Sequence, residues 1–160
     1  MRHGKAEQFA AEDHLRRLTE RGAREVYGAG EWLAEQGFSP THAFVSSSVR
    51  TQDTWEGLVA ATGSSVAPVV DDAIYTAGPD SAIDILRSTP PDAEVVLYVG
   101  HNPTAASVAH LLDDGDADPD AFRAMSAGFP PAALAVLEVL SPWADLEAAS
   151  ARLVAFYPGG

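Results

Sequence analysis

The chain has 160 residues, of which 46% are hydrophobic and 21% charged, and we expect one globular domain spanning residues 1–160. Its net charge of −13 repels phosphate backbones and anionic lipids, so we expect neither nucleic acid nor a membrane surface as a partner. Disulfides are excluded because there is no cysteine, and no run reaches the roughly 18 apolar residues of a membrane span. We therefore expect a soluble, cytoplasmic protein.

Helices and short strands alternate through the first half of the chain. Apolar residues at helical spacing lie between Thr19, which can cap a helix, and Gly37, which can end it. Short apolar runs bounded by Ser, Gly and Pro predict strands. The acidic pair Asp71-Asp72 is expected in a solvated loop. The expected elements are helices over 24–36, 51–62 and 80–87 and strands over 42–45 and 65–70.

The second half of the chain ends in a different pattern, in which two apolar runs follow each other without a helix. The expected elements are a strand over 94–99, a helix over 102–112 and a terminal hairpin of 132–139 and 152–157. Asn102 can cap the helix and Pro103 takes its first position. The acidic run from Asp113 to Asp120 is expected in a solvated loop. The fold class is therefore α/β, a three-layer α/β/α sandwich with a mostly parallel sheet and an antiparallel edge.

Histidine and arginine residues stand where predicted strands give way to helices. His101 follows the apolar strand over 94–99, and Arg50 opens the helix after the first strand. In open α/β sheets this edge carries the reactive groups. A neutral imidazole can attack a phosphoryl group when arginines hold its oxygens, because the planar guanidinium binds phosphate through two hydrogen bonds. Arg2 and His3 at the start of the chain complete a combination that predicts a phosphate pocket.

Four sequence motifs resemble one known family. They are Arg2-His3-Gly4-Lys5-Ala6-Glu7, Leu18-Thr19-Glu20-Arg21-Gly22, Ser46 to Thr54, and Gly100-His101-Asn102-Pro103. Together they resemble the histidine phosphatase superfamily, and specifically its small SixA-type phosphohistidine phosphatase branch. The resemblance runs over essentially the whole chain.

The resemblance implies a role for each matching residue. His3 would be the nucleophile that becomes transiently phosphorylated, and Arg2 and Arg50 would bind the phosphoryl oxygens. His101 would complete the pocket as a hydrogen-bond donor, with Asn102 beside it in substrate binding. No metal and no organic cofactor is implied, since the arginines supply the positive charge that Mg²⁺ would otherwise bring. The expected partner is a phosphorylated protein histidine or a small phosphorylated substrate.

The chain departs from the family pattern within the segment Ser46 to Thr54. Ser47, Gln52 and Asp53 stand where the family has Pro, Arg and Gln, so one of two arginines is lost. Asp53 is expected either to weaken anion binding by facing the pocket or to pair with Arg50.

A second departure precedes His3. The family has a full central strand of about six residues there, whereas only Met1 and Arg2 precede His3 in this chain. The pattern indicates truncation at an internal methionine or a true start that lies upstream. We expect the first central strand to be truncated, leaving an unfilled slot or two exposed edges in the sheet, and we expect His3 to be poorly anchored.

The function predicted first is a phosphohistidine phosphatase that dephosphorylates a protein phosphohistidine through a phosphohistidine enzyme intermediate. Its nitrogen leaving group is labile, so a strong general acid matters less. One alternative is a broad small-molecule phosphomonoesterase, in which Asp71 or Asp72 would assist an alcohol leaving group. Another is a non-catalytic protein that binds a phosphorylated ligand. His14 and His42 are expected to be surface or loop residues.

Overall fold

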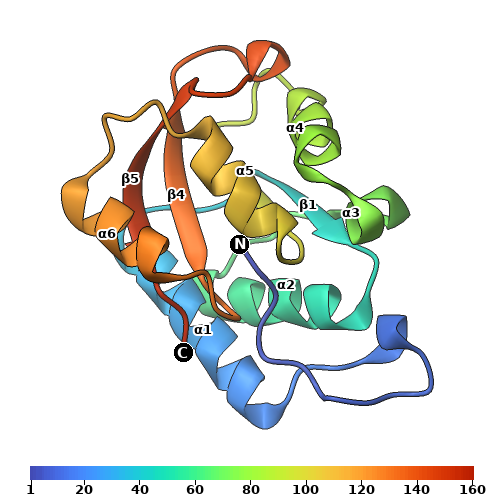
Figure 1. The fold of residues 1–160 in the computed structure, drawn as a ribbon. Coiled ribbons are helices and arrows are strands. Elements are labelled where there is room, and N and C mark those ends of the chain that lie inside the picture. Colours follow the sequence, from blue (N-terminus) through green and yellow to red (C-terminus); the bar gives the residue numbers. More distant parts are fainter.

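Two small sheets lie at the centre of the protein, for which a computed structural model describes residues 1–160. The strands are β1 (His42–Ser46), β2 (Val69–Asp71), β3 (Val96–Val99), β4 (Leu134–Val139) and β5 (Ala151–Tyr157). Three of them form a parallel sheet in the order β2-β1-β3, and β4 and β5 form an antiparallel hairpin beside it (Figure 1). The predicted α/β class, with a parallel sheet and an antiparallel edge, is confirmed.

Helices cover these sheets and alternate with the strands along the chain (Figure 1). They are α1 (Glu20–Glu35), α2 (Val49–Thr62), α3 (Asp72–Thr76), α4 (Pro79–Arg87), α5 (Thr104–Leu112) and α6 (Pro119–Ala127), with single 3₁₀ turns at η1 (Asp13–Leu15) and η2 (Trp143–Asp145). The α1 and α2 helices pack against each other, and α6 packs on β5. None of the helices combines the length and the apolar character that crossing a membrane requires.

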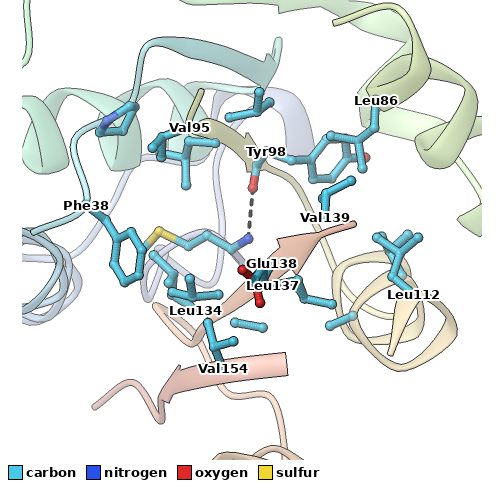
Figure 2. A pocket seen from close by; sticks show the side chains of 18 of the residues that line it. Phe38, Leu86, Val95, Tyr98, Leu112, Leu134, Leu137, Glu138, Val139 and Val154 are labelled. Carbon is cyan, nitrogen blue, oxygen red and sulfur yellow. Dashed lines mark hydrogen bonds between the residues drawn. The ribbon is translucent and has the colours of Figure 1, made fainter. Parts of the chain in front are cut away.

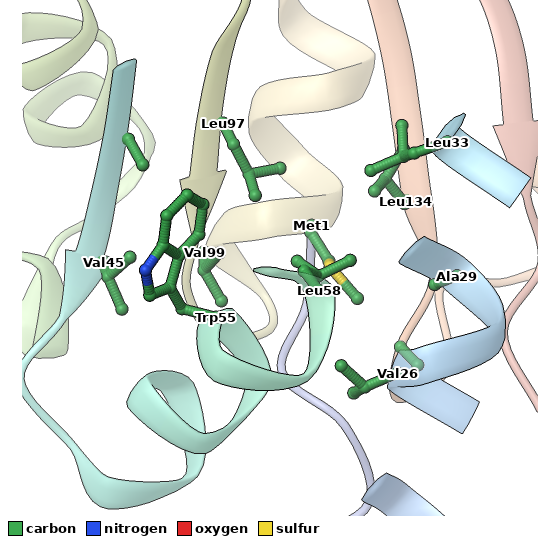
Figure 3. Close-up of a cluster of buried hydrophobic side chains, with 12 residues drawn as sticks. Met1, Val26, Ala29, Leu33, Val45, Trp55, Leu58, Leu97, Val99 and Leu134 are labelled. Carbon is green, nitrogen blue, oxygen red and sulfur yellow. The ribbon is translucent and has the colours of Figure 1, made fainter. Parts of the chain in front are cut away.

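Both faces of β1 and β3 are buried, and their side chains alternate between the two faces. Ala43 and Val45 of β1 belong to a core cluster with residues of α1 and α2, as does Val99 of β3 (Figure 3). Phe44 and Tyr98 point the other way, into a second cluster with residues of α3, α4 and α5. The sheet is thus the middle layer of a sandwich, and its carboxyl-terminal edge is held firmly from both sides.

Parts of two acidic segments that were expected to be loops instead begin helices, namely Asp71-Asp72 at α3 and Asp118 to Asp120 at α6, whereas residues 113–117 lie outside any helix as predicted. The Asp71 carboxylate accepts a hydrogen bond from Ala73 N at 2.8 Å and caps α3. The Asp118 carboxylate accepts from Asp120 N at 3.1 Å and Ala121 N at 2.9 Å and caps α6. The solvated-loop prediction was wrong at these positions because an aspartate can satisfy the free N–H groups of a helix start.

Two predicted helix boundaries also shift. The α1 helix begins at Glu20 rather than at residue 24, because the Thr19 hydroxyl accepts a hydrogen bond from Gly22 N at 3.0 Å and caps it there. The α5 helix begins at Thr104 rather than at Asn102. Asn102 does not cap this helix, since its side chain donates to a distant carbonyl instead.

The first three residues connect the two sheets. His3 N donates to Gly100 O at 3.1 Å and Gly100 N donates to Met1 O at 3.1 Å, which extends the β3 edge by one parallel bridge. On the other side, Arg2 N donates to Ala133 O at 3.0 Å and Ala132 N donates to His3 O at 3.1 Å. Only an isolated bridge, and no strand, forms at Arg2. The predicted poor anchoring of His3 is wrong for its backbone, which is bonded on both sides.

A cavity of about 610 Å³ occupies the rest of the space between β3 and β4. Its lining is largely apolar and includes Leu112 and Leu137, and the Met1 amine lies within it, donating to Tyr98 O at 2.8 Å (Figure 2). Burial lowers the pKa of this amine to about 5. The edges of β3 and β4 that face the cavity have no strand partner, so the expected slot is present.

Filling this slot should stabilise the protein. Joining a valine- and isoleucine-rich segment of about five residues to the Met1 amine should raise the free energy of unfolding by about 2 kcal/mol or more, because it buries apolar side chains and pairs both free edges. Urea unfolding measures the change. A Gly/Ser extension of equal length is the control, and equal stability of the two extended proteins would contradict the assignment of the slot.

Candidate active site

The structure brings four of the five predicted site residues to the carboxyl ends of β1 and β3. The rings of His3 and His101 lie with their centroids 5.2 Å apart at an angle of 60°. Arg50 Nη2 lies 3.5 Å from His101 Nδ1. Arg2 is held beside Gly100 by the isolated bridge described above. Residues nearly a hundred positions apart thus lie side by side because parallel strands end at the same edge.

His3 presents one unpaired ring nitrogen. Its Nδ1 lies 2.7 Å from Gly4 O, and since a carbonyl only accepts, Nδ1 carries the proton and Nε2 keeps a free lone pair. Burial lowers the pKa of His3 to about 4, and the positive charge of Arg50 acts in the same direction. The ring is therefore neutral at pH 7, as a nitrogen nucleophile must be.

Gly4 allows the segment after His3 to pack tightly. A Cβ at this position would lie 2.6 Å from Val26 Cγ2 and 3.0 Å from Gly22 O, closer than packing permits. Gly4 N also donates to Thr54 Oγ1 at 3.0 Å, which ties this segment to α2. The His3 side chain is consequently fixed by its neighbours as well as by its own backbone.

His101 is held between a hydroxyl and a cation. Its Nε2 lies 2.8 Å from Ser46 Oγ, and its Nδ1 faces Arg50. A guanidinium only donates, so Nδ1 accepts and Nε2–H donates to Ser46. Burial first, and then the neighbouring His3 and Arg50, lower the pKa of His101 to about 3.

Two arginines, of which Arg50 is buried and Arg2 half-buried, each leave a buried Nε–H donor free. The residue Arg50 is 6% exposed, and its two terminal nitrogens bond to Asp13 while Nε has no partner. Arg2 Nη1 donates to Phe129 O at 3.0 Å, and its buried Nε is also unpartnered. Buried donors without acceptors are costly in a folded protein. A tetrahedral oxyanion bound beside His3 would accept from such donors.

The fifth predicted site residue, Asn102, is engaged by a backbone carbonyl. Asn102 Nδ2 donates to Phe129 O at 2.9 Å, the carbonyl that Arg2 also uses, so Asn102 braces the loop that holds this arginine. Its role in substrate binding stays a prediction. Asp53 does not pair with Arg50, because its carboxylate accepts from Leu18 N at 3.1 Å.

We call Asp13, His14, Ser47 and Tyr75 the mouth of the site. Three of them, Asp13, His14 and Tyr75, stand in none of the sequence motifs. Tyr75 Oη donates to Asp13 Oδ2 at 2.7 Å, and the Tyr75 ring lies edge-on to the rings of His101 and His14. His14 Nε2 lies 3.0 Å from Ser47 Oγ. Only Ser47 was singled out in the motifs, since the short turns η1 and α3, which carry the other three, have no readable periodicity.

Comparison with known proteins found close relatives over nearly the full length. No protein-family model matches the chain. It is 35% identical over 147 residues to uncharacterized protein ML1117 of Mycobacterium leprae, covering 91% of this chain and 88% of that protein. It is 32% identical over 159 residues to uncharacterized protein Rv1276c of Mycobacterium tuberculosis, covering 98% of each.

Solved structures give a similar result. A protein of Nakamurella multipartitia described as a phosphohistidine phosphatase SixA superposes with a TM-score of 0.84 at 34% identity, covering 98% of this chain and 92% of that one. The corresponding protein of Agrobacterium tumefaciens gives 0.81 at 25% identity, covering 98% and 94%. A mycobacterial glucosyl-3-phosphoglycerate phosphatase, Rv2419c, shares the fold with a TM-score of 0.61 at 18% identity, covering 95% and 93%.

The free arginine donors predict anion binding. Inorganic phosphate should raise the unfolding temperature of the wild-type protein in a concentration-dependent way, since a ligand that binds only the folded state stabilises it. Arg50→Gln should remove most of this increase. Arg123→Gln is the matched control, because Arg123 is exposed and pairs only with Asp120. An equal phosphate effect in all three proteins would contradict the assignment.

The neutral His3 predicts a specific sensitivity to acid. Its folded-state pKa of about 4 lies below the ordinary 6.5, so the unfolded chain binds this proton first as the pH falls. Between about pH 6.5 and pH 4.5, the free energy of unfolding should fall by about 1–2 kcal/mol more in wild type than in His3→Asn. Urea unfolding without phosphate measures this. The Met1 amine contributes equally to the pH dependence of the two proteins. Parallel curves of unfolding free energy against pH would contradict the prediction.

Proposed function

The chain belongs to the SixA branch of the histidine phosphatase superfamily, and we propose that it removes a phosphoryl group from a protein phosphohistidine through a phosphohistidine intermediate on His3. The observation that carries this proposal is the convergence of a neutral imidazole with a free Nε2 and two guanidinium groups with buried, unpartnered Nε–H donors. That is the arrangement that nucleophilic attack on phosphorus requires, with charge neutralisation and no covalent chemistry by other side chains.

The first step transfers the phosphoryl group to the protein. His3 Nε2 attacks phosphorus, the bond from phosphorus to the substrate imidazole nitrogen breaks, and its electron pair stays on that nitrogen. When the other substrate nitrogen carries a proton, the leaving group is a neutral imidazole. Arg2 and Arg50 offset the charge on the three phosphoryl oxygens throughout.

The second step regenerates His3. A water molecule attacks phosphorus, the Nε2–phosphorus bond breaks with its electron pair returning to Nε2, and inorganic phosphate leaves with the water oxygen and the two water protons. His101 would assist both steps as a donor. A bound phosphoryl dianion favours the protonated ring, which could then donate from Nδ1 to a phosphoryl oxygen while Nε2–H keeps its bond to Ser46.

The two alternative functions have weaker support. A phosphomonoesterase needs a proton donor for an alcohol leaving group, but the Asp71 carboxylate is engaged in capping α3. A purely ligand-binding protein would have no use for a nucleophilic nitrogen left free, and His3 Nε2 makes no hydrogen bond while Nδ1 fixes the tautomer.

A phosphate-labelling experiment tests the proposal. Wild-type protein mixed with a ³²P-phosphohistidine protein and quenched in base should carry base-stable, acid-labile label on His3 and should release inorganic phosphate. His3→Asn should carry no label and lose at least about 1,000-fold in kcat/KM.

His110→Asn is the matched control, because His110 is exposed on α5, and it should behave as wild type. Release of phosphate only from a small phosphomonoester would support the phosphomonoesterase. Absence of label on His3 together with tight phosphate binding would support the ligand-binding protein.

A further inference from the structure

A fixed negative charge stands at the mouth of the pocket, at Asp13. Its carboxylate accepts from Tyr75 Oη at 2.7 Å, from Arg16 Nη1 at 2.7 Å and from Arg50 Nη2 at 2.9 Å. These donors, Tyr75 first, hold the pKa of Asp13 well below its usual range. Asp13 is therefore ionised at neutral pH and has no proton to give to a leaving group.

Asp13 contacts the two terminal nitrogens of the Arg50 guanidinium and leaves its Nε–H free. Arg50 Nη1 donates to Asp13 O at 2.7 Å and Nη2 donates to the carboxylate, so both contacts lie on the edge formed by the two terminal nitrogens. The other edge contains Nε, which is buried and unpartnered, and Nη2, which also faces His101. A phosphoryl oxygen on that edge and the Asp13 carboxylate can share the same arginine without competing.

The leaving group must lie on the same side of the pocket as Asp13. In a phosphoryl transfer the attacking and leaving atoms stand roughly in line on opposite sides of phosphorus. His3 Nδ1 is tied to Gly4 O, so Nε2 on the other side of the ring makes the attack and the leaving group departs away from His3. The Asp13 side chain is 52% exposed, whereas that of Arg50 behind it is 7% exposed.

A carboxylate in this position interacts electrostatically with the leaving group, and the sign of the interaction depends on the charge of that group. It attracts a protonated imidazole ring and stabilises the form of phosphohistidine that departs as a neutral imidazole. It repels an alkoxide or phenolate, which gains negative charge as its bond to phosphorus breaks.

Building on the proposed function, we propose that Asp13 is a specificity-determining residue that favours phosphoryl donors with a protonated nitrogen heterocycle as leaving group over donors that leave as an oxyanion. The residue acts through its charge at the mouth and not as a general acid.

Two small substrates test this inference. For phosphoimidazole and p-nitrophenyl phosphate, the ratio of the two kcat/KM values should fall by about 10-fold or more in Asp13→Asn, because the charge is removed while the side chain keeps its size. Asp13→Glu should restore most of the ratio. Asp84→Asn is the matched control, since Asp84 pairs with Arg87 on the surface of α4, and the ratio should not change.

The remaining outcomes overturn the inference. An equal loss with both substrates would mean that Asp13 only positions Arg50, and an unchanged ratio would mean that its charge does not reach the leaving group. Circular dichroism and thermal unfolding of each variant establish that it is folded. Failure of the wild-type protein to turn over either substrate would instead contradict the proposed phosphatase function, which separates the two results.

Discussion

A short ladder of backbone hydrogen bonds holds the first three residues between the ends of β3 and β4. It joins the parallel sheet to the hairpin through Gly100 on one side and Ala132 and Ala133 on the other. Without it the two sheets would share no strand, and His3 and Arg2 would hang from an unattached terminus. Because the N–H and C=O groups of His3 are both paired, its backbone is fixed beside Gly100 and Ala132.

A cavity lies beside this ladder of hydrogen bonds. About 610 Å³ between β3 and β4 remains unfilled, and Met1 lines this cavity while belonging to the core cluster on the α1–α2 face of the sheet. That cluster also includes Ala132 and Leu134 on the hairpin side, whereas the cluster on the other face is built mainly from β1, β3 and the helices α3, α4 and α5. The first residue therefore contributes apolar burial beside the cavity as well as a hydrogen bond to the ladder.

The site is rich in positive charge although the chain as a whole is acidic. The net charge is −13, but the pocket gathers Arg2, Arg50 and Arg16 around two neutral histidines. A buried guanidinium needs compensation, and Asp13 supplies it from the solvent side of Arg50 while leaving Nε free. The acidic residues elsewhere cap helices, as Asp71 and Asp118 do, or pair with arginine, as Asp114 does with Arg152 at 3.6 Å.

The sequence by itself determined the α/β class, because long periodic segments predict their own secondary structure. It also determined that His3, Arg50 and His101 meet, because parallel strands end at the same edge of a sheet. Only the tertiary structure decided that Asp13 and Tyr75 complete the mouth, that Asn102 braces Phe129 rather than capping a helix, and that His3 is firmly held. Those features arise from turns too short to show a period and from hydrogen bonds between residues distant in the chain, which no local pattern specifies.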